Sequence, residues 1–155
     1  MAASRSSVTD PYRAGCHVNK YLGDGALAVF GAPNTLTHHA DAAVDAALRI
    51  SRLVAERFDG ALRIGIGINT GKVIAGTIGG AGKLEFTIIG DTVNVAARIE
   101  QLTKTTGDTI LRTQDTLDAL AQPPAGLIDR GAHEVKDKAT TVHVYALEPT
   151  TDATA

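Results

Sequence analysis

The sequence of 155 residues has one cysteine, no tryptophan and few aromatic residues. The single cysteine, Cys16, cannot form an internal disulfide and excludes a zinc site built from cysteines. No hydrophobic run approaches the roughly 18 residues that a membrane-spanning helix needs. The 15 Lys+Arg and 17 Asp+Glu residues give a net charge of −2, which argues against nucleic-acid binding driven by bulk charge. We therefore expect a cytoplasmic chain with no membrane or nucleic-acid partner.

The overall composition is that of a globular protein. Hydrophobic residues make up 44% and charged residues 21% of the chain, which excludes wholesale disorder. At about 150 residues per domain, the length predicts one domain. We expect residues 1–15 to be poorly ordered, residues 16–148 to form the domain, and residues 149–155 to be a flexible tail.

The first third of the chain shows a strand pattern followed by a helix pattern. Two short apolar runs, 17–21 and 26–30, flank Asp24 and Gly25. This combination is typical of a β-hairpin, because glycine accepts the positive φ of a tight turn. Apolar residues spaced three and four apart then predict a helix over 38–58 with one buried stripe.

A strand with two internal glycines follows this helix. Residues 62–68 alternate with a period of two, so the three isoleucines share one face of the strand. Gly65 and Gly67 remove the side chains from the other face. Another element must therefore approach that face closely.

The remaining chain continues with short strands and helices. We expect a second hairpin over 71–89 and then a helix to about Leu102, capped by Asp91 or Thr92, whose side chains accept backbone N–H bonds. Further elements are expected as a strand near Ile110, a helix over 113–120, and strands near Leu127 and over 142–147. Mixed strands and helices with hairpins indicate an α+β fold rather than a doubly wound sheet.

Two polar groups stand at positions that the apolar pattern does not require. Asn94 and Arg98 are four residues apart, so they share one face of the predicted helix near its start. An amide and a guanidinium near a helix N-terminus can hold an anion. Lys20 and Asp24 form the other group, at the first hairpin. From these residues alone, a solvated helix face and an ordinary Asp-containing turn remain open.

Four blocks of sequence, in this order, resemble the catalytic domain of the class III adenylate/guanylate cyclases. The resemblance covers residues 18–147 and implies a ferredoxin-like sheet derived from a βαββαβ unit, with helices packed on one face. The blocks are Lys-Tyr-Leu-Gly-Asp-Gly (20–25), Arg-Ile-Gly-Ile-Gly-Ile-Asn-Thr-Gly (63–71), Phe-Thr-Ile-Ile-Gly-Asp-Thr-Val-Asn-Val-Ala-Ala-Arg (86–98) and Val-Lys-Asp-Lys (135–138).

The resemblance implies a lyase that converts ATP to 3′,5′-cyclic AMP and pyrophosphate for cyclic-nucleotide signalling. The ribose 3′-hydroxyl attacks the α-phosphate with the help of two divalent ions, Mg²⁺ or Mn²⁺. Asp24 matches a metal-binding aspartate, since carboxylate oxygen is the ligand these ions prefer. Asn94 matches the residue that positions the ribose. Arg98 matches the residue that stabilises charge on the transferring phosphoryl group.

The same resemblance implies which residues hold the rest of the substrate. Lys20 and Thr87 match the two positions that read the purine, and this pair is typical of adenine recognition. Lys136 matches the lysine that binds the terminal phosphates as a point charge. Asp137 departs from the glycine that the family more often has there.

Sites in this family form between two chains in a head-to-tail dimer, which implies a homodimer with two sites. The family's first strand carries a second metal-binding aspartate, and the N-terminal residues show no pattern of that strand. Asp10, beside Pro11, is a poor substitute. We therefore expect a domain that is incomplete at its N-terminus and lacks one metal ligand.

Two other functions stay open. A missing first strand favours a catalytically inactive cyclase-like module, a gene remnant or truncated form, that dimerises or binds nucleotide. A relative of the diguanylate cyclases would also use a hairpin carboxylate. The absence of a Gly-Gly-Asp/Glu-Glu-Phe signature and the presence of Asn94 and Arg98 argue against that relative.

Overall fold

A computed structural model describes residues 2–4, 16–22, 25–32, 36–80, 83–122, 126–135 and 141–147 of the chain. Its elements are β1 (Ala2–Ser4), β2 (Cys16–Leu22), β3 (Gly25–Phe30), α1 (His39–Phe58), β4 (Ile66–Ile68), β5 (Ile74–Gly80), β6 (Lys83–Ile89), α2 (Asp91–Thr106), β7 (Ile110–Thr113), α3 (Gln114–Ala119), β8 (Leu127–Glu134) and β9 (Thr141–Leu147).

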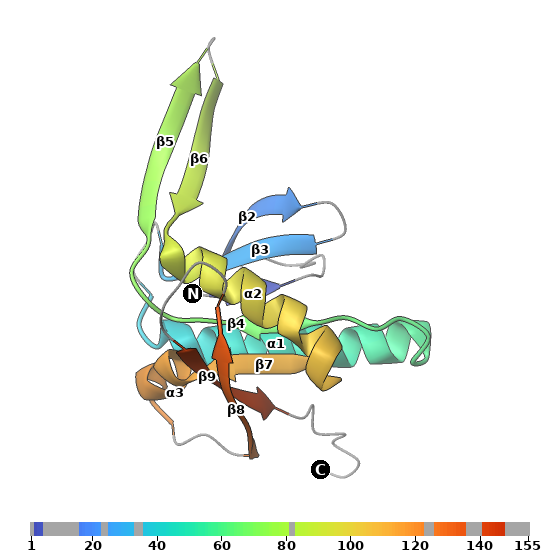
Figure 1. The fold of residues 1–155 in the computed structure, drawn as a ribbon. Coiled ribbons are helices and arrows are strands. Elements are labelled where there is room, and N and C mark those ends of the chain that lie inside the picture. Colours follow the sequence, from blue (N-terminus) through green and yellow to red (C-terminus); the bar gives the residue numbers. More distant parts are fainter. Residues whose placement is uncertain are drawn as a thin grey trace.

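The strands form two sheets. The main sheet has seven strands in the order β2-β3-β1-β4-β7-β9-β8, and β4 and β7 are its parallel pair. The strands β5 and β6 pair only with each other, as an antiparallel hairpin that projects away from the body of the molecule (Figure 1). Both predicted hairpins and the α+β class are confirmed.

The two long helices lie on opposite faces of the main sheet, with α2 in front of it and α1 behind it in Figure 1. Ala28 and Phe30 of β3 pack in the core with Ala43 of α1. Leu27 of the same strand packs instead with Ala96 of α2. Because both faces are covered, β3 is buried throughout. The prediction that the helices pack on one face is therefore wrong.

The glycines of the 62–68 segment lie where α2 meets the sheet. The three isoleucines share one face, as predicted, and this face packs against α1. A Cβ at Gly67 would lie 2.6 Å from the carbonyl oxygen of Ala96 and closer still to the amide nitrogen of Glu100. A Cβ at Gly65 would collide with the Thr103 hydroxyl. The predicted close approach is thus made by the backbone of α2, although the regular strand is limited to Ile66–Ile68.

The central position of the sheet is occupied by β1, so the prediction that the first strand is missing is wrong. Residues Ala2–Ser4 pair antiparallel with β3 on one side and with β4 on the other. Without this strand, β3 and β4 would each leave a row of backbone N–H and C=O groups unpaired inside the sheet. Three small residues carry too little apolar periodicity for the sequence to reveal such a strand.

The other helix predictions are largely confirmed. The helix predicted over 38–58 is α1, and Thr113 caps α3 by accepting a hydrogen bond from the Thr116 amide. The helix α2 differs at its start. Its N-cap is Gly90, with φ of 145°, and no side chain caps it, so the predicted capping by Asp91 or Thr92 is wrong. No helix within the described ranges is long and apolar enough to cross a membrane.

We expect Gly67→Ala to destabilise the fold by about 1–3 kcal/mol, because the added methyl would press on α2 backbone atoms, which cannot move aside as a side chain can. Gly76→Ala is the matched control, since nothing lies within 4 Å of a Cβ there. Urea unfolding of both variants measures the difference. Equal stability of the two variants would contradict the close packing of α2 on β4.

Candidate functional site

The start of α2 is fixed by the loop that follows β4. The Thr92 hydroxyl donates to the carbonyl oxygen of Lys72 at 2.7 Å. The Asn69 side-chain amide donates to the carbonyl oxygen of Thr92 at 3.1 Å. A Cβ at Gly71 would lie 2.6 Å from the Thr92 hydroxyl oxygen, so glycine is needed for this approach. The first turn of α2 is therefore held by directional contacts as well as by apolar packing.

Behind Asn69 lies a seam of buried hydroxyl groups that links β4, β7 and α3. The Thr113 hydroxyl donates to Asn69 Oδ1 at 2.7 Å. The Thr116 hydroxyl donates to the carbonyl oxygen of Ile68 at 3.3 Å and accepts from Thr70 at 3.1 Å. Asn69 is 4% exposed, and Thr113 and Thr116 are fully buried. Each of these polar side chains has a hydrogen-bond partner, as burial requires.

Asn94 and Arg98 lie on the opposite side of α2 from this buried packing. Both side chains are exposed, whereas the nearby Ala96 and Ile99 are each 1% exposed and face the sheet. Their separation of four residues places them one helical turn apart on a single face. The helix thus uses one face to bind the sheet and presents an amide and a guanidinium on the other.

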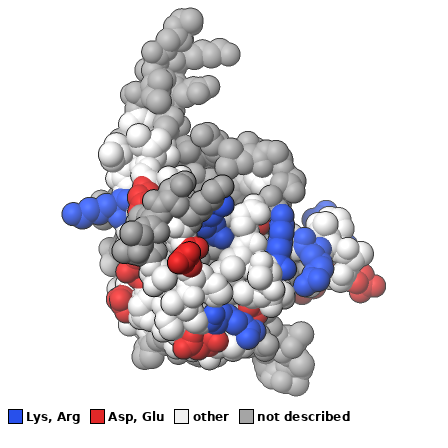
Figure 2. Space-filling model, in the orientation of Figure 1, with Lys and Arg blue, Asp and Glu red and all other residues white. Residues whose placement is uncertain are grey.

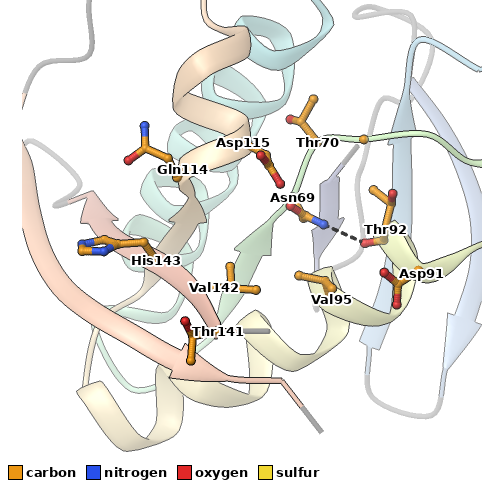
Figure 3. Close-up of a pocket in the computed structure, with 11 residues that line it drawn as sticks. Asn69, Thr70, Asp91, Thr92, Val95, Gln114, Asp115, Thr141, Val142 and His143 are labelled. Atoms are coloured by element: carbon orange, nitrogen blue, oxygen red, sulfur yellow. Dashed lines mark hydrogen bonds between the residues drawn. The ribbon is translucent and has the colours of Figure 1, made fainter. Parts of the chain in front are cut away.

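A cavity of about 430 Å³ opens beside the first turn of α2 (Figure 3). In the close-up, Asp91, Thr92 and Val95 of α2 form one side, and residues of β9 and α3 form the other. The carboxylates of Asp91 and Asp115 both line it, and none of the described residues that line it is a Lys or Arg. The described part of its wall is therefore acidic.

The β9 wall of this cavity is held in place by polar contacts. His143 Nε2 lies 2.6 Å from Asp129 Oδ1, and the His143 ring stacks on Tyr145 with centroids 4.7 Å apart. The Tyr145 hydroxyl donates to Gln114 Oε1 at 2.7 Å. A hydrogen bond from the Gly131 backbone N–H lowers the pKa of Asp129 below its usual value. The hydrogen bond with His143 lowers this pKa further.

Charges on the face of the molecule shown in Figure 2 are mixed. Lys and Arg side chains and Asp and Glu side chains are both present on it among the described residues. An anion bound on this face would therefore depend on individual side chains such as Arg98 rather than on a general basic surface.

The structure locates the other predicted site residues only in part. Lys20 lies in β2 and Thr87 in β6, and only their backbone is described. These two strands have Cα atoms within 8 Å of each other, so the two predicted purine readers belong to neighbouring strands. Asp24 and Lys136 lie outside the described residues, as does Asp10.

The connection that carries Lys136 begins next to α2. Val135, the residue before it, is 5% exposed and belongs to the same core cluster as Val95 and Ile99 of α2. The last described residue before Lys136 is therefore held against the buried face of α2.

Metal ligands can be assessed only within the described part of the chain. No group of three or more His, Cys, Asp or Glu residues there could hold a metal ion. The strand β1 contains Ala2, Ala3 and Ser4, and so contributes no carboxylate. Asp24 remains the predicted ligand, at the turn of a β2–β3 hairpin whose strands pair Leu22 with Gly25.

The sequence analysis assigned no role to Asn69, which lies within the block 63–71. An asparagine directly after a buried strand of isoleucines was the available signal. Its partner Thr92 is 23 residues away, so the contact could not be deduced from local pattern.

Comparison with known proteins places this geometry among nucleotide cyclases. Residues 9–149 match the family of the adenylate and guanylate cyclase catalytic domain. An uncharacterized protein of Mycobacterium tuberculosis is 40% identical over 108 residues, which are 68% of this chain and 19% of that protein. The chain thus spans about a fifth of the length of the curated relatives it matches.

Solved structures with the same fold include both substrate types. A bacterial light-regulated adenylyl cyclase superimposes with a TM-score of 0.71 at 33% identity, over 88% of this chain and 39% of that chain. The guanylate cyclase domain of a protein from Catenaria anguillulae, in complex with GTP, superimposes with a TM-score of 0.66 at 28% identity, over 86% of this chain and 72% of that chain.

The exposure of Asn94 and Arg98 predicts that neither stabilises the fold. Asn94→Ala and Arg98→Ala should each change the free energy of unfolding by less than about 0.5 kcal/mol. Ile99→Ala, on the buried face of the same helix, should cost about 2–5 kcal/mol. Urea denaturation of the three variants tests this contrast, and a large loss in Arg98→Ala would assign Arg98 to the core instead.

Proposed function

Because the chain belongs to the adenylate and guanylate cyclase catalytic domain family, we propose that it converts ATP to 3′,5′-cyclic AMP and pyrophosphate. A bond forms between the ribose 3′-oxygen and the α-phosphorus, and the bond from that phosphorus to the α–β bridging oxygen breaks. The hydroxyl proton passes to solvent, and pyrophosphate leaves.

The observation that carries the proposal is the pair of polar side chains on the exposed face of α2. The Arg98 guanidinium would stabilise the negative charge that develops on the transferring phosphoryl group. The Asn94 amide, one turn earlier, would orient the ribose so that its 3′-oxygen is in line. Both side chains are exposed and lie outside the face of α2 that packs on the sheet. The helix that carries them is held at its first turn by hydrogen bonds of Asn69 and Thr92.

Adenine rather than guanine is proposed as the base because of Lys20 and Thr87. A lysine ammonium donates to the N1 acceptor of adenine, whereas the N1 of guanine is itself a donor. The proximity of β2 and β6 supports a joint role for these two residues. Lys136, which follows the anchored Val135, would bind the terminal phosphates.

The Asp24 carboxylate is a hard oxygen donor and suits Mg²⁺ or Mn²⁺. In this proposal Asp24 would hold the divalent ion from the turn of the first hairpin. When bound, the ion supplies activation of the 3′-hydroxyl and neutralises phosphate charge. One carboxylate alone is a sparse ligand set, so substrate oxygens would complete the coordination.

We also propose that the site forms between two copies in a head-to-tail homodimer. Two observations support a second copy. The hairpin of β5 and β6 stands apart from the main sheet, and an isolated two-stranded sheet is marginally stable in water. At its base, Ile74 and Ile89 are 66% and 54% exposed. A partner that covers this region would bury both.

A second candidate function is favoured by β1. Ala2–Ser4 fills the central strand position but supplies no carboxylate beside the hairpin of Asp24. A chain with too few metal ligands would bind nucleotide or dimerise without turnover. Cyclase activity measurements distinguish this non-catalytic module from the enzyme.

Purified protein with Mn²⁺ and ATP should form cyclic AMP, and GTP should be a poorer substrate. Arg98→Ala should lower kcat by about 10²–10³-fold, because a donor to developing charge is lost. Chromatographic detection of both cyclic nucleotides measures this, with Arg98→Ala as the blank for contaminating cyclase. Product no greater than in that blank rejects the enzyme and leaves the non-catalytic module.

Mixing two inactive variants tests the shared site. Equal amounts of Asp24→Ala and Arg98→Ala should recover about a quarter of the wild-type activity, because half of the dimers are mixed and each of these has one intact site. A mixture of Asn94→Ala and Arg98→Ala is the matched control, since both changes lie on the same helix and no site is restored. Recovery in neither mixture would contradict a site formed between copies.

A further inference from the structure

Among the described residues, the Asn69 side chain joins the buried hydroxyl seam to α2 by hydrogen bonds on both sides. Its amide nitrogen donates to the Thr92 carbonyl oxygen at 3.1 Å, and its oxygen accepts from the Thr113 hydroxyl at 2.7 Å. The orientation of the amide is forced, because a backbone carbonyl can only accept. Asn69 is 4% exposed, so neither bond competes with bulk water.

The start of α2 depends on such an external contact. Gly90, the N-cap, provides no side-chain hydrogen bond, so the helix lacks the usual anchor at its first turn. The packing of the helix on Gly65 and Gly67 sets its distance from β4. Val95 and Ile99 also pack in the core along this helix, but apolar packing is non-directional. A hydrogen bond at the first turn adds a directional constraint on the position of the helix along its axis.

We propose that Asn69 is a positioning residue, which fixes α2 along its axis so that Asn94 and Arg98 meet the ribose and the α-phosphate; this inference rests on the proposed cyclase activity. Thr92, which Asn69 binds, precedes Asn94 by two residues, a rise of about 3 Å along the helix. Loss of the anchor would shift both side chains together. A misplacement of about 1 Å can cost roughly 10²-fold in rate.

The role differs from that of the hydroxyl seam itself. Thr70, Thr113 and Thr116 join β4, β7 and α3 to one another, and none of their hydrogen bonds reaches α2. The Thr116 hydroxyl bonds to Thr70 and to the carbonyl oxygen of Ile68, so removing it weakens the fold but leaves both hydrogen bonds of Asn69 in place. The seam therefore offers a control for purely structural loss.

Asn69→Leu keeps the side-chain volume and removes the amide. We expect kcat for cyclic AMP formation to fall about 10- to 100-fold, while KM for ATP changes less than about two-fold. Thr116→Val should lower the melting temperature comparably and leave kcat within about two-fold. A fall of kcat in Thr116→Val equal to that in Asn69→Leu overturns the proposal.

Hydrogen exchange of the full chain gives a readout that does not require activity. Amides of residues 93–97 should exchange faster in Asn69→Leu than in wild type, and in Thr116→Val they should not. Unchanged exchange in Asn69→Leu overturns the positioning role. If the wild-type chain is inactive, the proposed function is rejected. Faster exchange in Asn69→Leu than in this inactive wild type would still support the anchoring role of Asn69.

A surface variant keeps the test available if Asn69→Leu does not fold. Thr92→Val, at a half-buried position, removes the second bond to the first turn, from the Thr92 hydroxyl to the Lys72 carbonyl oxygen. The same pattern is expected at smaller size: lower kcat, unchanged KM and faster exchange at 93–97. Wild-type kcat and exchange in Thr92→Val overturn the dependence of the site on this anchor.

Discussion

The close approach of the α2 backbone to Gly65 and Gly67 is the constraint on which the rest of the molecule depends. Any side chain at Gly67 would meet main-chain atoms of Glu100 and Ala96, which cannot rotate out of the way. The helix α2 therefore packs directly on β4, and the two glycines make this close contact possible. Because α1 covers the opposite face, the described side chains of β3 and β4 are buried between the two helices.

A helix seated in this way can present functional groups only on its outer face. The seam of Asn69, Thr113 and Thr116 belongs to the buried side and orders the helix, whereas Asn94 and Arg98 belong to the exposed side. Stability and the proposed chemistry are thus assigned to different faces of one element. Substitutions on the two faces can be separated experimentally for this reason.

Much of the fold could be predicted because its long elements have strong patterns. The apolar stripe of α1 predicted this helix correctly, and the paired glycines of the 62–68 strand predicted the close approach of another element correctly. The predictions that were wrong concern features that depend on tertiary context. The strand β1 exists because its neighbours β3 and β4 need partners, and its own three residues carry no signal. The helices on both faces could have been inferred from the unbroken apolar run of β3, since a strand covered on one face alternates.

Of the candidate site, Asn94 and Arg98 are placed with their side chains, and Lys20 and Thr87 with their backbone. Asp24 and Lys136 stay predictions.

Exposure of the proposed catalytic pair has a physical consequence for how a cyclase of this form can work. At a separation of about 4 Å, a guanidinium and a phosphoryl charge attract by about 1 kcal/mol in water and by about 4 kcal/mol at the effective dielectric constant of a protein surface near 20. An uncovered Arg98 would therefore contribute too little to a transition state. A second copy that excludes water from the outer face of α2 would raise this interaction to a useful size. In the proposed enzyme, dimerisation is then required for catalysis because it excludes water from Arg98, and it also supplies Asp24 from the partner. The exposed base of the β5–β6 hairpin is where such a partner would bury apolar surface.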